Sequence, residues 1–346
     1  MKGQKDIHLT FVIPDVNAFQ SGGNIYNKNL IEGLRKIGYK PIVMDLTTFL
    51  QISPSKLTGY YFFDTLYFNE LAATFKGKNS TSYFYLIVHH LESLYPPEGW
   101  TRADYFQQKE WVVLRQYDGF VTSSPFTSNY LDTNDLNQHK ITLLPAIDFK
   151  PRPNNKTVPT VKGIMVANLV ERKGIFPFLE ALANSLETNL PTISKLKIQI
   201  DLIGTAEIEP VYAEKCLSLI INHPVLKKII SYHGQLLPQQ LYSLYKKANL
   251  FISTSFMETY GMALQEARAF QLPILALDCG NVSNHVENLK NGWLMPAIPE
   301  LIKQLGMLIT QPNLVGSMQQ KIINRKKEDF YTWEKAARLF IQQLHF

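Results

Sequence analysis

Short apolar stretches alternate along the chain with longer segments in which apolar residues recur at helical spacing. His8–Ile13 is apolar and favours a strand, the loop Phe19–Asn24 contains two glycines, and Pro41–Leu46 is typical of a second strand. Between them, a predicted helix ends at Gly38. Its apolar face consists of Tyr26, Leu30, Ile31, Leu34 and Ile37. Strand, glycine loop, helix and strand in this order predict a βαβ unit.

The rest of the first half is rich in aromatic residues and has few turn signals. We expect Tyr83–Val88 to be a buried strand that ends at His89, and Gly119–Thr122 and Ile141–Leu144 to be short strands. Most aromatic rings between Tyr60 and Tyr85 fit a strand core, and stacking of some rings on a bound ligand remains an alternative.

The alternation restarts after a polar, proline-bearing linker at Pro151–Lys156. Strands are expected at Gly163–Ala167, Leu196–Ile203, Ile229–His233, Leu250–Ser253 and Pro273–Leu277, and helices from Pro177 and at Leu237–Ala248, Met262–Phe270 and Thr332–Leu344. This series predicts two doubly wound, Rossmann-like α/β domains. We place the first at residues 1–155, together with a returning helix at 326–346, and the second at residues 156–325.

Composition excludes several function classes. Lys and Arg total 35 and Asp and Glu total 29, which gives a net charge of +6 on a chain of 346 residues. That charge density does not favour nucleic acid as a partner. The two cysteines, Cys216 and Cys279, are too few for a disulfide framework or a zinc site. Since no apolar stretch approaches the ~20 residues that span a bilayer, we expect a cytoplasmic protein whose excess of cations could help it sit on anionic lipid at the inner face of the membrane.

Three loops carry candidate chemistry. Gly22 and Gly23 precede a helix, where exposed N–H groups favour a phosphate, although an ordinary turn is an equally simple interpretation. Arg172 and Lys173 place two cations in a strand-to-helix loop, where they would neutralise the charge of a diphosphate. A charged loop that faces only solvent is the alternative interpretation. Glu258 lies in a third loop and Glu266 eight residues on, in a helix, where a buried carboxylate needs a partner such as a ligand hydroxyl.

These residues carry a family resemblance that covers nearly the whole chain. The stretch Glu258-Thr-Tyr-Gly-Met-Ala-Leu-Gln-Glu266 resembles the Glu-x7-Glu signature of the retaining glycosyltransferases of family 4, whose glycosyltransferase-B architecture has two Rossmann-like domains facing a central cleft and a last helix that crosses back to the first domain. Further similar motifs, in family order, are Ser21-Gly22-Gly23, Val88-His89-His90, Tyr117–Ser124, Lys173-Gly174, Asp278–Asn281 and Tyr331–Glu334.

The resemblance implies a retaining transfer of sugar from a nucleotide-diphosphate sugar to a glycan or lipid-linked acceptor. A UDP-sugar is the favoured donor, and no further cofactor and no metal are expected, since the chain has no Asp-x-Asp. The implied catalytic residues are His89, Lys173 and Glu258. The implied donor-binding residues are Gly22, Gly23, Asn168, Arg172, Lys173, Glu258, Tyr260, Gly261 and Glu266. Front-side attack, with no protein nucleophile, fits retention without a second carboxylate.

Three positions depart from the family pattern. Ala167-Asn168 stands where the family has Gly-Arg, so either Arg172 replaces the missing cation or Asn168 supplies a neutral donor. His90 replaces an Asp, and Asn284 or His285 occupies the place of a Glu. A nucleotide-sugar epimerase, a phosphorylase and a non-catalytic glycan- or nucleotide-binding member of the same fold remain the alternatives.

Overall fold

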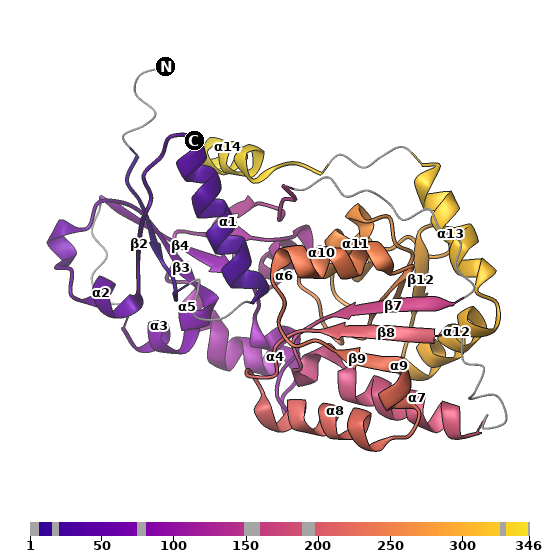
Figure 1. Cartoon of the computed structure of the whole chain (residues 1–346). Coiled ribbons are helices and arrows are strands. Elements are labelled where there is room, and N and C mark those ends of the chain that lie inside the picture. The colour runs from indigo at the N-terminus through magenta and orange to yellow at the C-terminus, as the bar shows by residue number, and fades with distance from the viewer. Residues whose placement is uncertain are drawn as a thin grey trace. The chain divides into compact units, whose positions relative to one another are not determined.

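The computed structural model describes residues 7–15, 21–74, 81–148, 160–188, 198–325 and 330–344 (Figure 1). The chain divides into two compact units, one made of Met1–Asp148 with Phe330–Phe346 and the other of Phe149–Asp329. The linker predicted at Pro151–Lys156 lies outside the described residues.

The first unit is built on a six-stranded parallel sheet of order β2-β1-β3-β4-β5-β6. Its strands are β1 (Leu9–Val12), β2 (Ile42–Met44), β3 (Gly59–Asp64), β4 (Ser82–Val88), β5 (Gly119–Thr122) and β6 (His139–Thr142). Its helices are α1 (Gly22–Lys36), α2 (Leu46–Leu50), α3 (Phe68–Thr74), α4 (Arg102–Tyr105), a π-helical turn (Phe106–Glu110), α5 (Trp111–Leu114), α6 (Pro125–Thr133) and α14 (Trp333–Leu344).

Helix α1 begins and ends as its sequence dictates. The Ser21 side chain caps the first turn by accepting from the N–H of Asn24 at 3.1 Å. At the other end, Gly38 has a φ of 94°, a left-handed value that glycine adopts at low cost after a helix. The apolar face predicted for this helix is buried at Tyr26 and Leu34.

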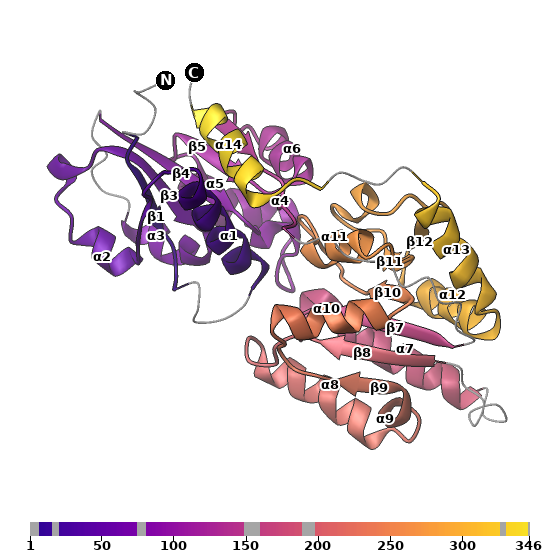
Figure 2. The ribbon, with the colours of Figure 1, turned by 45° about the horizontal axis from the view of Figure 1, so that its top comes forward.

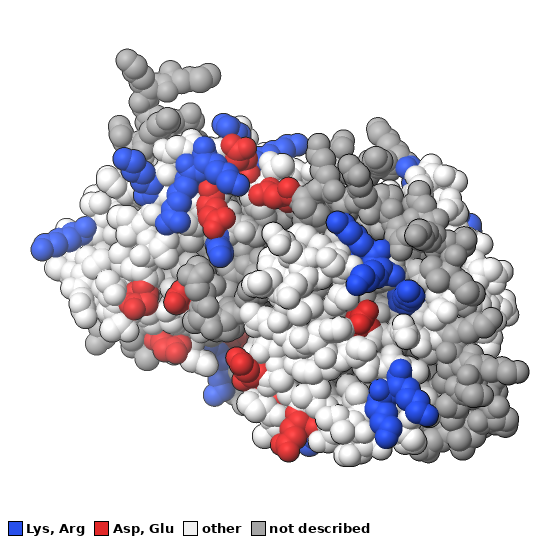
Figure 3. Space-filling view, viewed as in Figure 1, with Lys and Arg blue, Asp and Glu red and all other residues white. Residues whose placement is uncertain are grey.

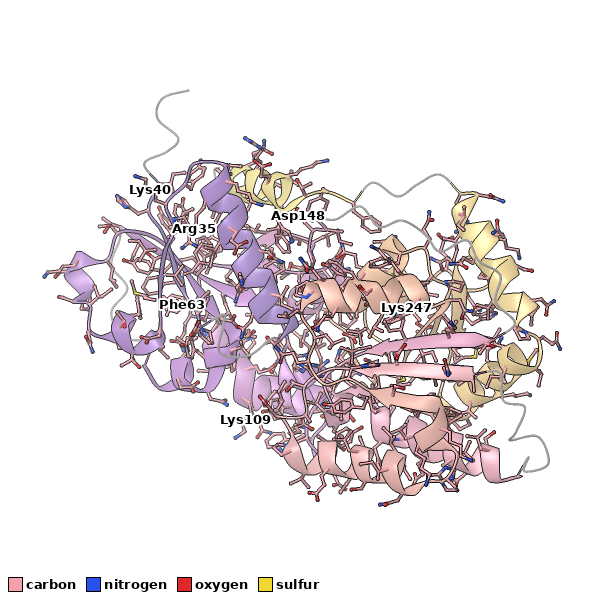
Figure 4. The ribbon with its side chains drawn as sticks, in the orientation of Figure 1. Arg35, Lys40, Phe63, Lys109, Asp148 and Lys247 are labelled. Atoms are coloured by element: carbon pink, nitrogen blue, oxygen red, sulfur yellow. The ribbon has the colours of Figure 1, made fainter. Side chains whose placement is uncertain are left out.

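Helix α14 returns from the far end of the sequence to pack against α1, as Figures 1 and 2 both show. The two helices can approach closely because Gly33 has no Cβ. A Cβ at this position would lie 2.5 Å from the carbonyl oxygen of Trp333. Asp148, labelled in Figure 4, accepts from the N–H of Trp333 at 2.9 Å and caps α14. The predicted returning helix therefore completes the core of the first unit.

The second unit has its own six-stranded parallel sheet, ordered β12-β11-β10-β7-β8-β9. Its strands are β7 (Val161–Val166), β8 (Ile198–Ile203), β9 (Ile230–Tyr232), β10 (Leu250–Ser253), β11 (Ile274–Leu277) and β12 (Gly292–Met295). Its helices are α7 (Ile175–Thr188), α8 (Pro210–Asn222), α9 (Leu226–Ile229), α10 (Pro238–Lys247), α11 (Met262–Ala269), α12 (Ile298–Thr310) and α13 (Asn313–Ile323).

Each sheet reverses its strand order near its centre, as a doubly wound sheet does. In the second unit β7 and β10 are neighbours while the chain continues outward from each in opposite directions, and in the first unit the same holds for β1 and β3. The predicted fold class, two Rossmann-like α/β units with a returning last helix, is confirmed. None of the helices in the described residues is long and apolar enough to span a membrane.

Some observed elements differ from the predicted ones. Helix α7 begins at Ile175, two residues before Pro177, because a proline is tolerated anywhere in the first turn, where N–H groups have no helical acceptor. Strand β12 (Gly292–Met295) is among the elements that were not predicted.

Candidate functional site

The strand-order reversal of the second unit gathers three of its candidate residues. In doubly wound sheets, ligands bind beyond the carboxyl ends of the strands that flank this point. The loop after β7 carries Arg172 and Lys173, and the loop after β10 carries Glu258. Lys173 and Glu258, which are 85 positions apart in the sequence, are thereby brought into contact.

Lys173 and Glu258 form an ion pair at this edge of the sheet. Lys173 Nζ lies 2.5 Å from Glu258 Oε1, and the Ser255 hydroxyl donates to the same oxygen at 2.7 Å. The two side chains are only 17% and 13% exposed. Because a largely buried charge needs a partner, each of these groups stabilises the charge of the other.

Burial and charge act together on the titration of this pair. Burial lowers the pKa of the Lys173 ammonium from its ordinary value, against the opposing attraction of Glu258. Burial acts to raise the pKa of the Glu258 carboxyl, but the Lys173 and Arg172 cations outweigh it and the pKa is lowered. Glu258 is therefore a carboxylate at neutral pH.

Arg172 is fixed against the loop that carries Glu258. Its Nη1 donates to the carbonyl oxygen of Met257 at 3.1 Å, and its own carbonyl accepts from the N–H of Phe256 at 2.9 Å. Asn168 lies just beyond β7, and its Oδ1 accepts from the N–H of Thr205 at 3.2 Å. The Asn168 oxygen is thus engaged by the loop after β8, which leaves its amide nitrogen as the group able to donate to a ligand.

Two glycines let these loops approach each other. Gly174 has a φ of 62°, and a Cβ there would lie 2.2 Å from the carbonyl oxygen of Thr254. Gly280 has a φ of 50°, and a Cβ there would lie 2.2 Å from the carbonyl oxygen of Glu258. Larger residues at either position would push the β10 loop away from its neighbours.

The loop after β10 leads directly into α11. Gly261 is the N-cap of this helix, with a φ of 93° that glycine adopts without strain. The first N–H groups of α11 and the positive end of its dipole therefore lie at the edge that holds Lys173 and Glu258. An anion at this edge meets two cations and a helix N-terminus.

Glu266 lies one turn into α11. Burial raises the pKa of its carboxyl to about 7, although a hydrogen bond with the Tyr245 hydroxyl acts in the opposite direction. Tyr245 is fully buried, and its hydroxyl oxygen lies 3.2 Å from the carbonyl oxygen of Ala263. Glu266 is consequently a carboxyl that gains from a hydroxyl donor supplied by a ligand.

The first unit places its candidates beyond the carboxyl ends of β1, β3 and β4, which are neighbours in its sheet. His89 follows β4, and its ring packs on Gly23, where a Cβ would lie 2.8 Å from His89 Cδ2. His89 Nε2 lies 3.0 Å from Asn27 Oδ1 and 3.5 Å from Asp64 Oδ2, and the Asn27 amide donates to that same Asp64 oxygen. Since Asn27 donates to Asp64 through its nitrogen, its oxygen faces His89 and accepts the Nε2 proton.

Asn27 and Asp64 are functional candidates that sequence reasoning missed. Asp64 is fully buried at the end of β3, and Asn27 is fully buried on the inner face of α1. An Asp that follows a buried strand, and an Asn on an otherwise apolar helix face, are the signals that could have found them. His89, Gly22 and Gly23 belong to the first unit, and the remaining predicted residues to the second.

A model of the family described as "Glycosyl transferases group 1" matches residues 147–329, just over half of the chain. An alpha-monoglucosyldiacylglycerol synthase of Acholeplasma laidlawii is 26% identical over 157 residues, which are 45% of this chain and 37% of that protein. The matched stretches span 26–42% of the length of the curated relatives.

Solved structures match over nearly the whole chain. Sucrose-phosphate synthase from Thermosynechococcus elongatus superposes with a TM-score of 0.71 at 16% identity, covering 97% of this chain and 98% of its own. HepE of Anabaena, solved in complex with UDP and glucose, gives a TM-score of 0.71 at 12% identity, covering 97% of this chain and 99% of its own. At such identities the likeness concerns the fold.

Proposed function

Because the chain belongs to the family of glycosyl transferases group 1, we propose that it transfers a sugar, with retention, from a nucleotide-diphosphate sugar to an acceptor. The observation that carries this proposal is the Lys173–Glu258 pair at the N-terminal end of α11. It combines a cation for a diphosphate with a carboxylate for sugar hydroxyls, at the edge where doubly wound sheets bind ligands.

In this proposal Lys173 exchanges its partner when the donor binds. The diphosphate takes the place of the Glu258 carboxylate beside Lys173 Nζ, and Glu258 then accepts from hydroxyls of the donor sugar. Arg172, held by Met257, supplies the second cation in place of the arginine that Asn168 replaces. Such fixed charges stabilise the negative charge that grows on the departing diphosphate, which is the work a divalent metal performs in other transferases.

Glu266 accepts from the ribose hydroxyls of the donor in this proposal. Its buried carboxyl and its place one turn inside α11 suit a neutral sugar hydroxyl better than a cation. A UDP-sugar is the donor that we favour, and the UDP complex of HepE, whose fold is similar, supports this choice.

The sugar transfer proceeds at the front face of the donor. The bond between the anomeric carbon and the diphosphate oxygen breaks while the acceptor oxygen bonds to the same face, and the departing phosphate oxygen takes the acceptor proton. No protein nucleophile is required. His89 lies beside the reacting sugar in this scheme, with its ring held by Asn27 and Asp64.

The acceptor is a glycan or a lipid-linked sugar, and the lipid product named for the Acholeplasma relative supports the second class. Peripheral contact with anionic lipid belongs to this part of the proposal. Among the described residues on the face shown in Figure 3, cations and anions lie in small groups separated by uncharged surface. An acceptor screen therefore needs both free glycans and glycolipids in vesicles.

The first test measures release of nucleoside diphosphate from UDP-, GDP- and ADP-sugars. We expect turnover to persist in EDTA and the Lys173→Ala variant to turn over about 10²- to 10³-fold more slowly, since one fixed partner of the developing charge is lost. Lys247→Ala, which removes an exposed lysine of α10 labelled in Figure 4, is the matched control and should retain wild-type activity.

Four outcomes would contradict the proposal. Loss of activity in EDTA with rescue by magnesium or manganese would refute the metal-free mechanism. An unaffected Lys173→Ala enzyme would refute the placement of the diphosphate. Sugar interconversion without release of diphosphate would indicate an epimerase, and binding without any turnover a non-catalytic member of the fold.

A further inference from the structure

A buried histidine holds the backbone of the loop that enters α11. His285 follows β11 in the next loop of the sheet and is only 3% exposed. Its Nε2 lies 2.7 Å from the carbonyl oxygen of Tyr260, and Asn281 Nδ2 donates to the same oxygen at 3.0 Å. The His285 and Tyr260 rings also meet edge to face, with centroids 4.8 Å apart.

Arg268 decides which nitrogen of His285 carries the proton. Arg268 Nη1 lies 3.1 Å from His285 Nδ1. Because a guanidinium only donates and a carbonyl oxygen only accepts, Nδ1 is the acceptor and Nε2 carries the hydrogen. Burial and the Arg268 charge lower the pKa of His285 to about 4, so the ring keeps this neutral form at neutral pH.

The two donors occupy both lone pairs of the Tyr260 carbonyl. Turning the Tyr260–Gly261 peptide would leave three buried polar groups without partners, which is unfavourable. The position of Asn281 is also fixed. Its Oδ1 accepts from Asn284 Nδ2 at 2.6 Å, and its N–H donates to the carbonyl oxygen of Glu258 at 2.8 Å. The peptide plane is therefore fixed.

The opposite end of the same peptide is the Gly261 N–H. In a trans peptide the N–H points away from the carbonyl oxygen, so it points away from His285 and Asn281. We infer that His285, oriented by Arg268, is a positioning residue that holds the Gly261 N–H in the direction of the donor's diphosphate. This inference rests on the proposed function, because it takes the donor to lie at the N-terminal end of α11.

The chemistry of the side chain suits it to this role. An ionised carboxylate could not donate to the Tyr260 carbonyl, whereas a neutral histidine with a fixed tautomer can. The donor loop of this chain is thus supported by a hydrogen-bond relay of Arg268, His285 and Tyr260. The relay aligns this backbone dipole before the ligand arrives, so the Tyr260–Gly261 peptide need not turn when the ligand binds.

The test compares His285→Leu with His285→Gln, whose side-chain nitrogen can replace Nε2. Titration calorimetry with UDP and with uridine separates the phosphates from the nucleoside. We expect His285→Leu to weaken UDP binding about tenfold and uridine binding less than twofold, since one hydrogen bond to a charged group is misdirected. His285→Gln should recover most of the UDP affinity. His223→Leu removes another buried histidine of the same unit, which caps α9, and should leave both ligands unaffected.

A second measurement needs no ligand. In protein labelled with ¹⁵N-glycine, the Gly261 amide resonance should shift in His285→Leu, return toward its wild-type position in His285→Gln, and stay unchanged in His223→Leu. Equal losses of UDP and uridine binding, or an unmoved Gly261 resonance, would overturn the inference. Failure of the wild-type protein to bind UDP, GDP or ADP would instead refute the proposed donor, while the Gly261 resonance would still report on the relay itself.

Discussion

The surroundings of Glu266 disfavour the ionised form of its carboxyl. Its folded pKa is about 7 and its ordinary value 4.5, so between these values the folded chain keeps a proton that the unfolded chain has released. Stability therefore falls as pH rises through this window. We expect Glu266→Gln to raise the free energy of unfolding by about 1–3 kcal/mol at pH 8, and to change it little near pH 4.5, as measured by urea unfolding.

The control for this prediction is Glu214→Gln, at an exposed position on α8. It should have no pH-dependent effect on unfolding. A Glu266→Gln effect of the same size at both pH values would show that the carboxyl is not held protonated by burial. A carboxylate that costs stability is typical of a group retained for binding, and the same variant should bind UDP more weakly.

Single residues mark the limit of what sequence could predict. Glu258 and Lys173 were identifiable because each lies in a recognisable loop, and the structure places them in contact. Asp64 was not identifiable from the sequence, because the strand before it lies in an aromatic-rich stretch without clear periodicity. The tautomer of His285 depends on Arg268, a neighbour 17 positions away whose direction no local pattern reveals.

At the scale of elements, the start of α1 is shaped by what packs on it. Sequence reasoning treated Gly23 as a place where backbone approaches a ligand, and the structure shows that the missing Cβ makes room for the His89 ring. We predict that Gly23→Ala displaces this ring and lowers the turnover number about tenfold or more, because small misplacements of a group beside the reacting atoms are costly.

The same variant should leave the affinity for UDP within twofold of wild type, because the proposed diphosphate contacts belong to the second unit. Gly306→Ala is the control, since a Cβ there meets no atom within 4 Å. A Gly23→Ala enzyme with normal turnover and weaker UDP binding would favour the ligand-approach interpretation instead. Steady-state kinetics and calorimetry together decide between the two.

Most elements were predictable because each is a short unit with local signals. Strands such as β10 are continuous apolar runs, and α14 has a clear apolar stripe. Strand order was not readable from such signals, since it depends on which strands pair across long loops. The neighbourhood of β1, β3 and β4, which gathers His89, Asn27 and Asp64, therefore became visible only in the structure.

At the scale of the whole molecule, α14 belongs to the unit that begins the chain. Trp333 is buried between α14 and α1, and its ring meets Tyr26 edge to face at 5.3 Å. We expect Trp333→Ala to destabilise the first unit by about 3–5 kcal/mol. Hydrogen exchange read by mass spectrometry should show lost protection in α1 and β1.

Peptides of the second unit should keep their protection, because that unit has separate core clusters. Lys335→Ala, on the exposed side of α14, is the control and should change nothing. Equal loss of protection in both units would show that they unfold as one cooperative body.

The return of α14 also sets an order of events during synthesis. The ribosome delivers Met1–Asp148 first, but the helix that covers α1 follows only after all of Phe149–Asp329 has emerged. Until then the apolar surface around Tyr26 and Leu34 lacks its cover. At about 5–20 residues per second, this interval lasts on the order of ten seconds or more, during which the nascent first unit exposes this apolar surface and the second unit can already be complete.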